Sequence, residues 1–173
     1  MSAYIKISFK GIVYRAHKPV WASSPLSGEG AKVHGGRFNP KGVAALYTAI
    51  EQITALAEHQ QGFPHRPQPI TLCAYEVDCS DLVDLTDPKN LDALNIKETD
   101  LSCAWEIIAD NKKNPPSWKI AEELINDNVA GIIVPSYARN TPVGGKNIVF
   151  WHWEGTTPHK VIVIDDEKRL SKN

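Results

Sequence analysis

The sequence predicts a mixed α+β fold, in which strands and helices are not arranged in regular βαβ units. Short apolar runs typical of strands recur along the chain, and three consecutive helical patterns interrupt them between about residues 89 and 126. The length of 173 residues and the hydrophobic content of 42% are sufficient for a sizeable core. We expect one domain over residues 1–173, with its core at about 11–165 and a charged tail at 166–173.

The first two predicted strands flank a long loop. Residues 12–14 form an apolar run, and residues 43–47 form another. Between them, residues 18–36 lose periodicity and collect prolines and glycines, which predicts a loop. Trp21 and Val33 within this loop indicate that parts of it are packed.

A helix is expected to follow the second strand. Thr48 and Glu51 fit a capping box at its start, and Gly62 and Pro64 stop it by about residue 61. The apolar stripe of this helix comprises Ile50, Ile53, Leu56 and Ala57. The polar residues that fall within about 60° of one another away from that stripe are Tyr47, Glu51, Thr54 and Glu58.

The remaining elements are expected in the following order. The strands are 70–77, with a short extension at 82–85, then 129–134, 147–153 and 160–164. The helices lie near 89–95, 103–111 and 117–126. Pro115-Pro116 precedes the last helix, and Ser117 is its expected N-cap.

Composition argues against several classes of function. The net charge of −1 disfavours sequence-independent binding of nucleic acid, which needs a basic surface. No segment has the ~18 consecutive apolar residues that would span a bilayer. The cysteines are odd in number and show no CxxC spacing; they are Cys73, Cys79 and Cys103. The histidines form no HExxH motif. We therefore expect no metal site and a reducing, cytoplasmic environment.

The most informative motif is Gly35-Gly36-Arg37-Phe38-Asn39-Pro40. Two adjacent glycines allow unusual backbone conformations and the close approach of a ligand. Arg37 carries a permanent charge and a planar fork of donors that suits phosphate or carboxylate. With Tyr47 and Glu58 following nearby, the motif indicates a nucleotide site. It is not a P-loop, because GxxxxGK[ST] is absent.

Other polar residues admit both a structural and a functional interpretation. For the helix face that carries Glu58, a solvated surface is the simpler interpretation, and only the nearby Gly-Gly-Arg loop favours a site. Arg15 suits a structural salt bridge as well as it suits a ligand. Ser136 follows a buried strand, where a serine most often caps a turn, and no GxSxG motif supports a hydrolase triad.

Together, these residues resemble the RES domain family, which is named for its arginine, glutamate and serine. The order and spacing of several pieces carry the resemblance through most of the chain. They are Tyr14-Arg15, Gly35–Pro40, Leu46-Tyr47, Glu58, Val134-Pro135-Ser136, Asn147–Trp151 and Pro158–Val161.

The resemblance implies a fold similar to ADP-ribosyltransferase toxins of the diphtheria-toxin type, with NAD as substrate. It also implies the toxin of a bacterial toxin–antitoxin pair. The cognate antitoxin, of the Xre type with a helix-turn-helix region, would block the active site and make any contact with DNA indirect. By position, the catalytic residues are Arg37, Tyr47 and Glu58, and the substrate-binding residues are Tyr14, Arg15, Gly36 and Ser136.

The chemistry fits these residue types. Cleavage of the nicotinamide–ribose bond develops positive charge on the sugar, which a carboxylate such as Glu58 stabilises. Arg37 first, and Arg15 second, would hold the pyrophosphate or adenylate side. Tyr47 would stack on nicotinamide or shape its pocket, and Ser136 would orient a ribose or Glu58.

The leading expectation is degradation of NAD, with ADP-ribose passing to water or inorganic phosphate. One alternative is transfer of ADP-ribose to a specific protein, which shares the cleavage step. Another is a non-catalytic binding module that acts through its antitoxin. Glu51, on the same face as Glu58, is a secondary candidate.

Overall fold

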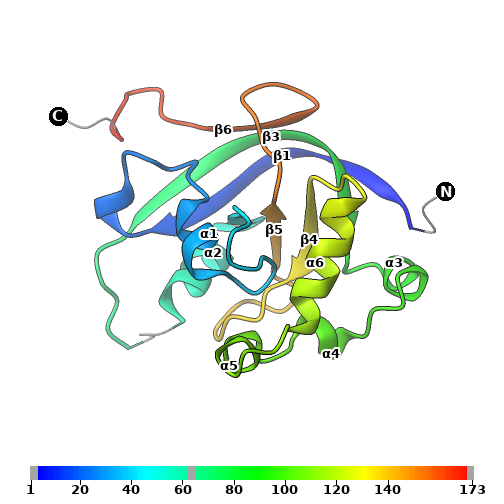
Figure 1. Ribbon diagram of the computed structural model, residues 1–173. Helices are drawn as coiled ribbons and strands as arrows, with labels where there is room; N and C mark the ends of the chain where they lie inside the picture. The colour runs from blue at the N-terminus through cyan, green and yellow to red at the C-terminus, as the bar shows by residue number, and fades with distance from the viewer. Residues whose placement is uncertain (1–3, 62–64, 171–173) are drawn as a thin grey trace.

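The strands form one mixed sheet, most of which closes into a ring. Their order is β1-β2-β5-β4-β3-β6, and a further pairing of β1 with β3 closes all but β6 into a ring. The computed structural model describes residues 4–61 and 65–170. Figure 1 shows β1 and β3 as two long curved strands side by side, with β6 along β3. The strands are β1 (Lys6–His17), β2 (Leu46–Ala49), β3 (Thr71–Asp84), β4 (Gly131–Pro135), β5 (Lys146–Phe150) and β6 (His159–Val163).

Short helices fill the connections between the strands. They are the 3-10 turn η1 (Pro19–Trp21), α1 (Glu29–His34), α2 (Gln52–Gln60), α3 (Pro88–Ala93), α4 (Glu98–Leu101), α5 (Trp105–Asp110) and α6 (Pro116–Asn126). In Figure 1, α1 and α2 lie to one side of β5, and α3 and α6 lie to the other. No helix in the described part of the chain is long and apolar enough to cross a membrane. The predicted α+β class is confirmed.

The inner strands are buried because their sequences are apolar on both faces. Gly131–Val134 in β4 and Ile148–Phe150 in β5 are buried throughout. β3 alternates instead, with Cys73, Tyr75 and Val77 buried in the core. The polar residues at the start of β5 and directly after β4 are therefore held on a buried base.

Two strands are longer than the sequence predicts. β1 begins at Lys6 rather than at residue 12, and the segments expected at 70–77 and 82–85 form one strand, β3. Each strand supplies backbone partners to the other, from the pair Lys6 and Val83 to the pair His17 and Thr71. Backbone pairing, which does not require apolar side chains, therefore extends both strands beyond their apolar runs.

The segment at 18–36 is not irregular throughout, because it contains η1 and α1. None of the residues of α1 is buried, so no apolar periodicity marks this helix in the sequence. It ends at Gly35, whose φ of 75° is in the left-handed region that glycine favours. Parts of the segment are packed, as expected, but through Leu26 and Ala31, which contact the core. Trp21 and Val33, which suggested this packing, are exposed by 62% and 61%.

The capping box expected at Thr48 and Glu51 is wrong. Thr48 lies in β2, where its hydroxyl donates to the carbonyl oxygen of Ile148 at 2.8 Å. Glu51 is the N-cap of α2, but its side chain makes no capping hydrogen bond. Strand pairing between β2 and β5 therefore extends past the residue at which the helix was expected to begin.

The buried face of α2 also differs from the expected stripe. Ile53 is 55% exposed, whereas Thr54, Ala55 and Ala57 are buried. Small side chains suit this face because α2 packs closely on β1. The helix ends at Gln60, as expected, while Gly62 and Pro64 lie outside the described residues.

The start of α6 differs in its cap. Its N-cap is Pro115, and Pro116 is its first residue, where a fixed φ suits a helix and no backbone donor is needed. Ser117 is fully buried, and its hydroxyl oxygen accepts from the thiol of Cys103 at 3.5 Å. Ser117 therefore joins α6 to the segment before α5 instead of capping the helix.

Candidate functional site

The predicted site residues gather around one cleft. A cleft of about 540 Å³ adjoins a smaller hollow of about 260 Å³. Tyr14 lines only the smaller hollow, and Ser136 reaches the site through its contact with Glu58. Residues of the predicted set that line the larger cleft are Arg15, Gly36, Arg37, Tyr47 and Glu58.

The carboxylate of Glu58 is surrounded by hydrogen-bond donors. The hydroxyl of Ser136 and the amide Nδ2 of Asn147 each donate to Oε1 at 2.5 Å. The amide of Gln61 donates to Oε2. Hydrogen bonds to a carboxylate are about twice as strong as neutral ones, so the two contacts to Oε1 fix the side chain.

The hydroxyl of Ser136 is itself held in place. It accepts from the backbone N–H of Ala138 at 3.3 Å and lies 3.0 Å from the hydroxyl of Thr141. Because the single proton of Ser136 goes to Glu58, the Thr141 hydroxyl donates. The turn after β4 thus directs Ser136, which the sequence indicated as a possible turn cap, at the carboxylate.

Asn147 was missed as a site residue, although it belongs to the motif that supports the family resemblance. It lies in β5 and lines both the cleft and the hollow. The usable signal is a polar amide directly before the apolar run 148–150, on a strand that pairs with β4 just before Ser136.

Arg37 holds one wall of the cleft. Its Nη1 donates to the carbonyl oxygens of Leu101 at 3.2 Å and Cys103 at 2.6 Å, in the connection between α4 and α5. The guanidinium also lies 4.9 Å from the ring centroid of Tyr137, within cation–π range. Burial raises the pKa of Tyr137 to about 12, so the ring is neutral at physiological pH. A guanidinium has five N–H donors, so these contacts do not exhaust it.

Arg15 also lines the cleft and holds a different loop. Its Nη1 donates to the carbonyl oxygens of Pro25 and Ser27, each at 3.1 Å. These residues belong to the loop between η1 and α1. The two arginines thus each fix a separate segment beside the cleft that both line.

The backbone donors of the Gly-Gly-Arg loop are largely used within the protein. The N–H groups of Gly35 and Gly36 donate to the carbonyl oxygens of Ala31 at 2.8 Å and Asn39 at 3.0 Å. The N–H of Phe38 donates to the hydroxyl of Tyr47 at 3.0 Å. The side chain of Arg37 is the charged group that this loop presents to the cleft.

Tyr47 supports this loop from β2. Its hydroxyl donates to Oδ1 of Asn39 at 2.6 Å while accepting from the N–H of Phe38. Burial raises the pKa of Tyr47, so the phenol is protonated at physiological pH. A Cβ on Gly36 would lie 2.4 Å from this hydroxyl oxygen, so the loop and the tyrosine fit only with glycine there.

Glu51 lies outside this arrangement. It is the exposed N-cap of α2 and lines neither the cleft nor the hollow. Glu58 is thus the carboxylate of α2 that the fold directs at the other predicted site residues.

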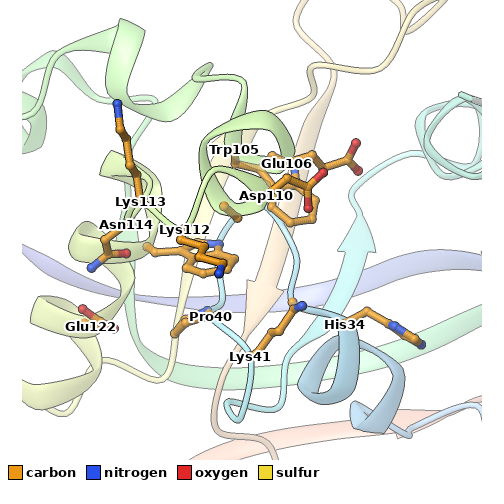
Figure 2. A pocket seen from close by; sticks show the side chains of 13 residues that line it. His34, Pro40, Lys41, Trp105, Glu106, Asp110, Lys112, Lys113, Asn114 and Glu122 are labelled. Carbon is orange, nitrogen blue, oxygen red and sulfur yellow. The ribbon is translucent and has the colours of Figure 1, made fainter.

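A second hollow, of about 790 Å³, lies beside the Gly-Gly-Arg loop (Figure 2). It shares Gly35, Trp105 and Glu106 with the cleft. The Nε1 of Trp118 donates to the carbonyl oxygen of Gly36 at 2.7 Å, which fixes the ring of Trp118 beside that of Trp105. The ionic residues around it are Lys41, Lys112, Lys113, Glu106, Asp110 and Glu122.

Within residues 4–61 and 65–170, no group of three or more His, Cys, Asp or Glu side chains is placed to hold a metal ion. The chemistry that the described cleft offers is that of the carboxylates of Glu58 and Glu106, hydroxyls, amides and two guanidinium groups.

Comparisons with known proteins match this arrangement to one family. The model of the RES domain family matches residues 12–173. A solved structure of similar fold is a chain of the MbcT–MbcA toxin–antitoxin complex of M. tuberculosis, with a TM-score of 0.65 and 21% sequence identity. The alignment covers 92% of this chain and 84% of that one. No match was found among curated proteins.

Proposed function

The chain belongs to the RES domain family, and we propose that it is a single-domain toxin that cleaves NAD⁺ at the nicotinamide–ribose bond. Loss of NAD⁺ would then arrest growth. The observation that carries this proposal is the carboxylate of Glu58, which is fixed by Ser136 and Asn147 beside two arginines in one cleft.

Glu58 is suited to the bond that breaks. As nicotinamide leaves, its ribose gains positive charge, and a carboxylate fixed in advance stabilises that charge without reorganising. Ser136 and Asn147 hold one oxygen of the carboxylate. The same carboxylate accepts a hydrogen bond from a ribose hydroxyl in this proposal.

The arginines are assigned to the phosphates. Both line the cleft, and a guanidinium matches phosphate oxygens with paired donors. Arg37 and Arg15 each already hold two carbonyl oxygens of a neighbouring loop. Binding of the pyrophosphate to their remaining N–H groups would therefore also order the two segments that the arginines hold.

The role of Tyr47 is narrower than stacking on nicotinamide. Its hydroxyl is committed to Asn39 and Phe38, so its first effect is to hold the loop that carries Arg37. Its ring still lines both the cleft and the smaller hollow, where it shapes the space for the nicotinamide ring.

We also infer a partner that controls the toxin. The solved structure of similar fold is a toxin–antitoxin complex. An Xre-type antitoxin that covers the cleft near Arg37 would exclude NAD⁺, and DNA contact would come through that antitoxin. A co-crystal structure in which the cleft stays open to solvent would contradict this arrangement.

We also propose that the fold is of the ADP-ribosyltransferase type seen in diphtheria toxin. A fold of the diphtheria-toxin ADP-ribosyltransferase type would place NAD⁺ across the cleft between Arg15 and Glu58. A structure with NAD⁺ bound to a Glu58→Gln variant would test it, because that variant should bind substrate and turn it over slowly.

The decisive experiment incubates purified protein with NAD⁺, with and without phosphate and with and without cell lysate. We expect rapid release of nicotinamide by the wild type, and loss of that activity in Glu58→Gln and Arg37→Ala. Glu51→Gln is the matched control, since it changes a carboxylate of the same helix that lies outside the cleft.

The same assay, together with a growth assay of cells that express each variant, separates the alternatives. Labelled protein in the lysate, with little loss of NAD⁺ in its absence, would favour a mono-ADP-ribosyltransferase. Toxicity that survives in a folded Glu58→Gln variant would favour a non-catalytic module acting through its partner.

A further inference from the structure

The two oxygens of the Glu58 carboxylate differ in their surroundings. Ser136 Oγ and Asn147 Nδ2 both lie 2.5 Å from Oε1. A carboxylate has about four lone-pair sites on its two oxygens, so Oε1 is saturated by these donors. Among the described residues, Oε2 receives a hydrogen bond from Gln61 only.

Strand register fixes both donors on Oε1. Asn147 in β5 pairs with Ala49 of β2 and with Val134 of β4. A shift of one residue would turn its side chain to the other face of the sheet. Ser136 follows β4 directly, and its N–H donates to the carbonyl oxygen of Gly145 at 2.9 Å. The donor positions are therefore set by the sheet and not by the carboxylate.

Asn147 carries a cost that an apolar residue would avoid. Its Oδ1 is buried without a hydrogen bond among the described residues. An unpaired buried acceptor destabilises the fold and is rare enough to need an explanation. Rotating the amide would bring Oδ1 against Oε1, so that two acceptors face each other, and the chemistry therefore fixes Nδ2 on Glu58.

The other oxygen meets a side chain that can leave. Gln61 is exposed, directly follows the last residue of α2 and lines the cleft together with Glu58. A long exposed side chain regains rotamer freedom when it is released. A hydroxyl entering the cleft can thus replace the Gln61 amide on Oε2 and leave both contacts to Oε1 unchanged.

We propose that Asn147 is a positioning residue that, with Ser136, locks Oε1 of Glu58 so that Oε2 receives a hydroxyl of the substrate ribose in place of Gln61. This inference rests on the proposed cleavage of NAD⁺. It assigns different tasks to the two oxygens and adds one residue to the predicted set.

The first test is the pH profile of Asn147→Asp in steady-state NAD⁺ cleavage. Two carboxylates this close cannot both ionise easily, so the pKa of the pair rises. We expect the acidic limb of the kcat profile to move upward by about one pH unit or more. A merely structural role would lower kcat by the same factor at every pH.

The second test separates kcat from KM. In Asn147→Leu, loss of one charge-assisted hydrogen bond should lower kcat about tenfold or more and change KM by less than about threefold. In Gln61→Ala, kcat should stay within about twofold, with an equal or lower KM. Val143→Ala is the control, because this fully exposed side chain lies in the loop between β4 and β5.

Thermal melts first establish that each variant is folded. A wild type that leaves NAD⁺ intact would overturn the proposed function and this inference with it. An active wild type whose pH profile is unchanged by Asn147→Asp would overturn the positioning role alone. Loss of turnover in Gln61→Ala, or a raised KM at constant kcat in Asn147→Leu, would also overturn it.

Discussion

The hydroxyl of Ser136 donates to Oε1 of Glu58 at 2.5 Å, across a separation of 78 residues in the chain. Ser136 follows β4, whereas Glu58 lies on α2, which packs on β1. The contact therefore exists only when β1, β2, β5 and β4 have assembled in order. The contact between Ser136 and Glu58 therefore depends on the complete sheet.

The first prediction concerns the substitution Ser136→Ala. It removes one of two donors on Oε1, and a hydrogen bond to a charged group contributes about 1.5–3 kcal/mol. We expect kcat for NAD⁺ cleavage to fall by about 10- to 100-fold, measured as nicotinamide release. Thr141→Val removes a hydroxyl that contacts Ser136 but not Glu58, so its effect should be smaller. Equal losses in the two variants would argue that the turn, and not the donor, matters.

The second prediction concerns the substitution Tyr47→Phe. Without the hydroxyl, the N–H of Phe38 and Oδ1 of Asn39 both lose a partner. We expect the free energy of unfolding to fall by about 1–3 kcal/mol in urea denaturation. Tyr14→Phe should cost less, because the Tyr14 hydroxyl has no hydrogen bond within the described residues. If Tyr47→Phe lost activity with full stability, a direct role of the hydroxyl in substrate binding would be favoured.

The fold class could be predicted because β4, β5 and α6 are marked by their own apolar residues. The apolar run at 129–134 and the helical pattern at 117–126 correspond to β4 and α6 closely. The full lengths of β1 and β3 could not be predicted, since they depend on pairing with each other. The helix α1 could not be predicted either, because none of its residues is buried.

The residues that gather at the cleft could be named from the sequence, but their contacts could not. Glycine, arginine, tyrosine and glutamate at short spacing marked one wall. The sequence could not reveal that Tyr47 holds the loop, or that Asn147 shares Oε1 with Ser136. These contacts join different elements of the fold. The sequence could not reveal either that the N–H groups of Gly35 and Gly36 are bonded within the protein.

The third prediction concerns the substitution Gly36→Ala. The new Cβ would lie 2.4 Å from the hydroxyl oxygen of Tyr47 and 2.6 Å from Oδ1 of Asn39, closer than such atoms approach. We expect the loop to shift, with loss of NAD⁺ cleavage and a fall in the free energy of unfolding of about 1–3 kcal/mol. Gly155→Ala, where nothing lies within 4 Å of the added Cβ, is the control. Wild-type behaviour of Gly36→Ala would show that the loop is not tightly fitted to Tyr47.

The fourth prediction concerns stability and His17. Burial lowers the pKa of His17 below its ordinary value of 6.5, and the charge of Arg15 lowers it further. Below pH 6.5 the unfolded chain therefore binds a proton that the folded protein resists, so stability falls as the pH falls. Unfolding in urea at several values between about pH 7.5 and 5.5 should show this loss. His17→Gln should flatten the slope, leaving the part due to His59, whose pKa burial also lowers. His34→Gln changes an exposed histidine and should keep the wild-type slope. An unchanged slope in His17→Gln would show that His17 does not cause the loss of stability.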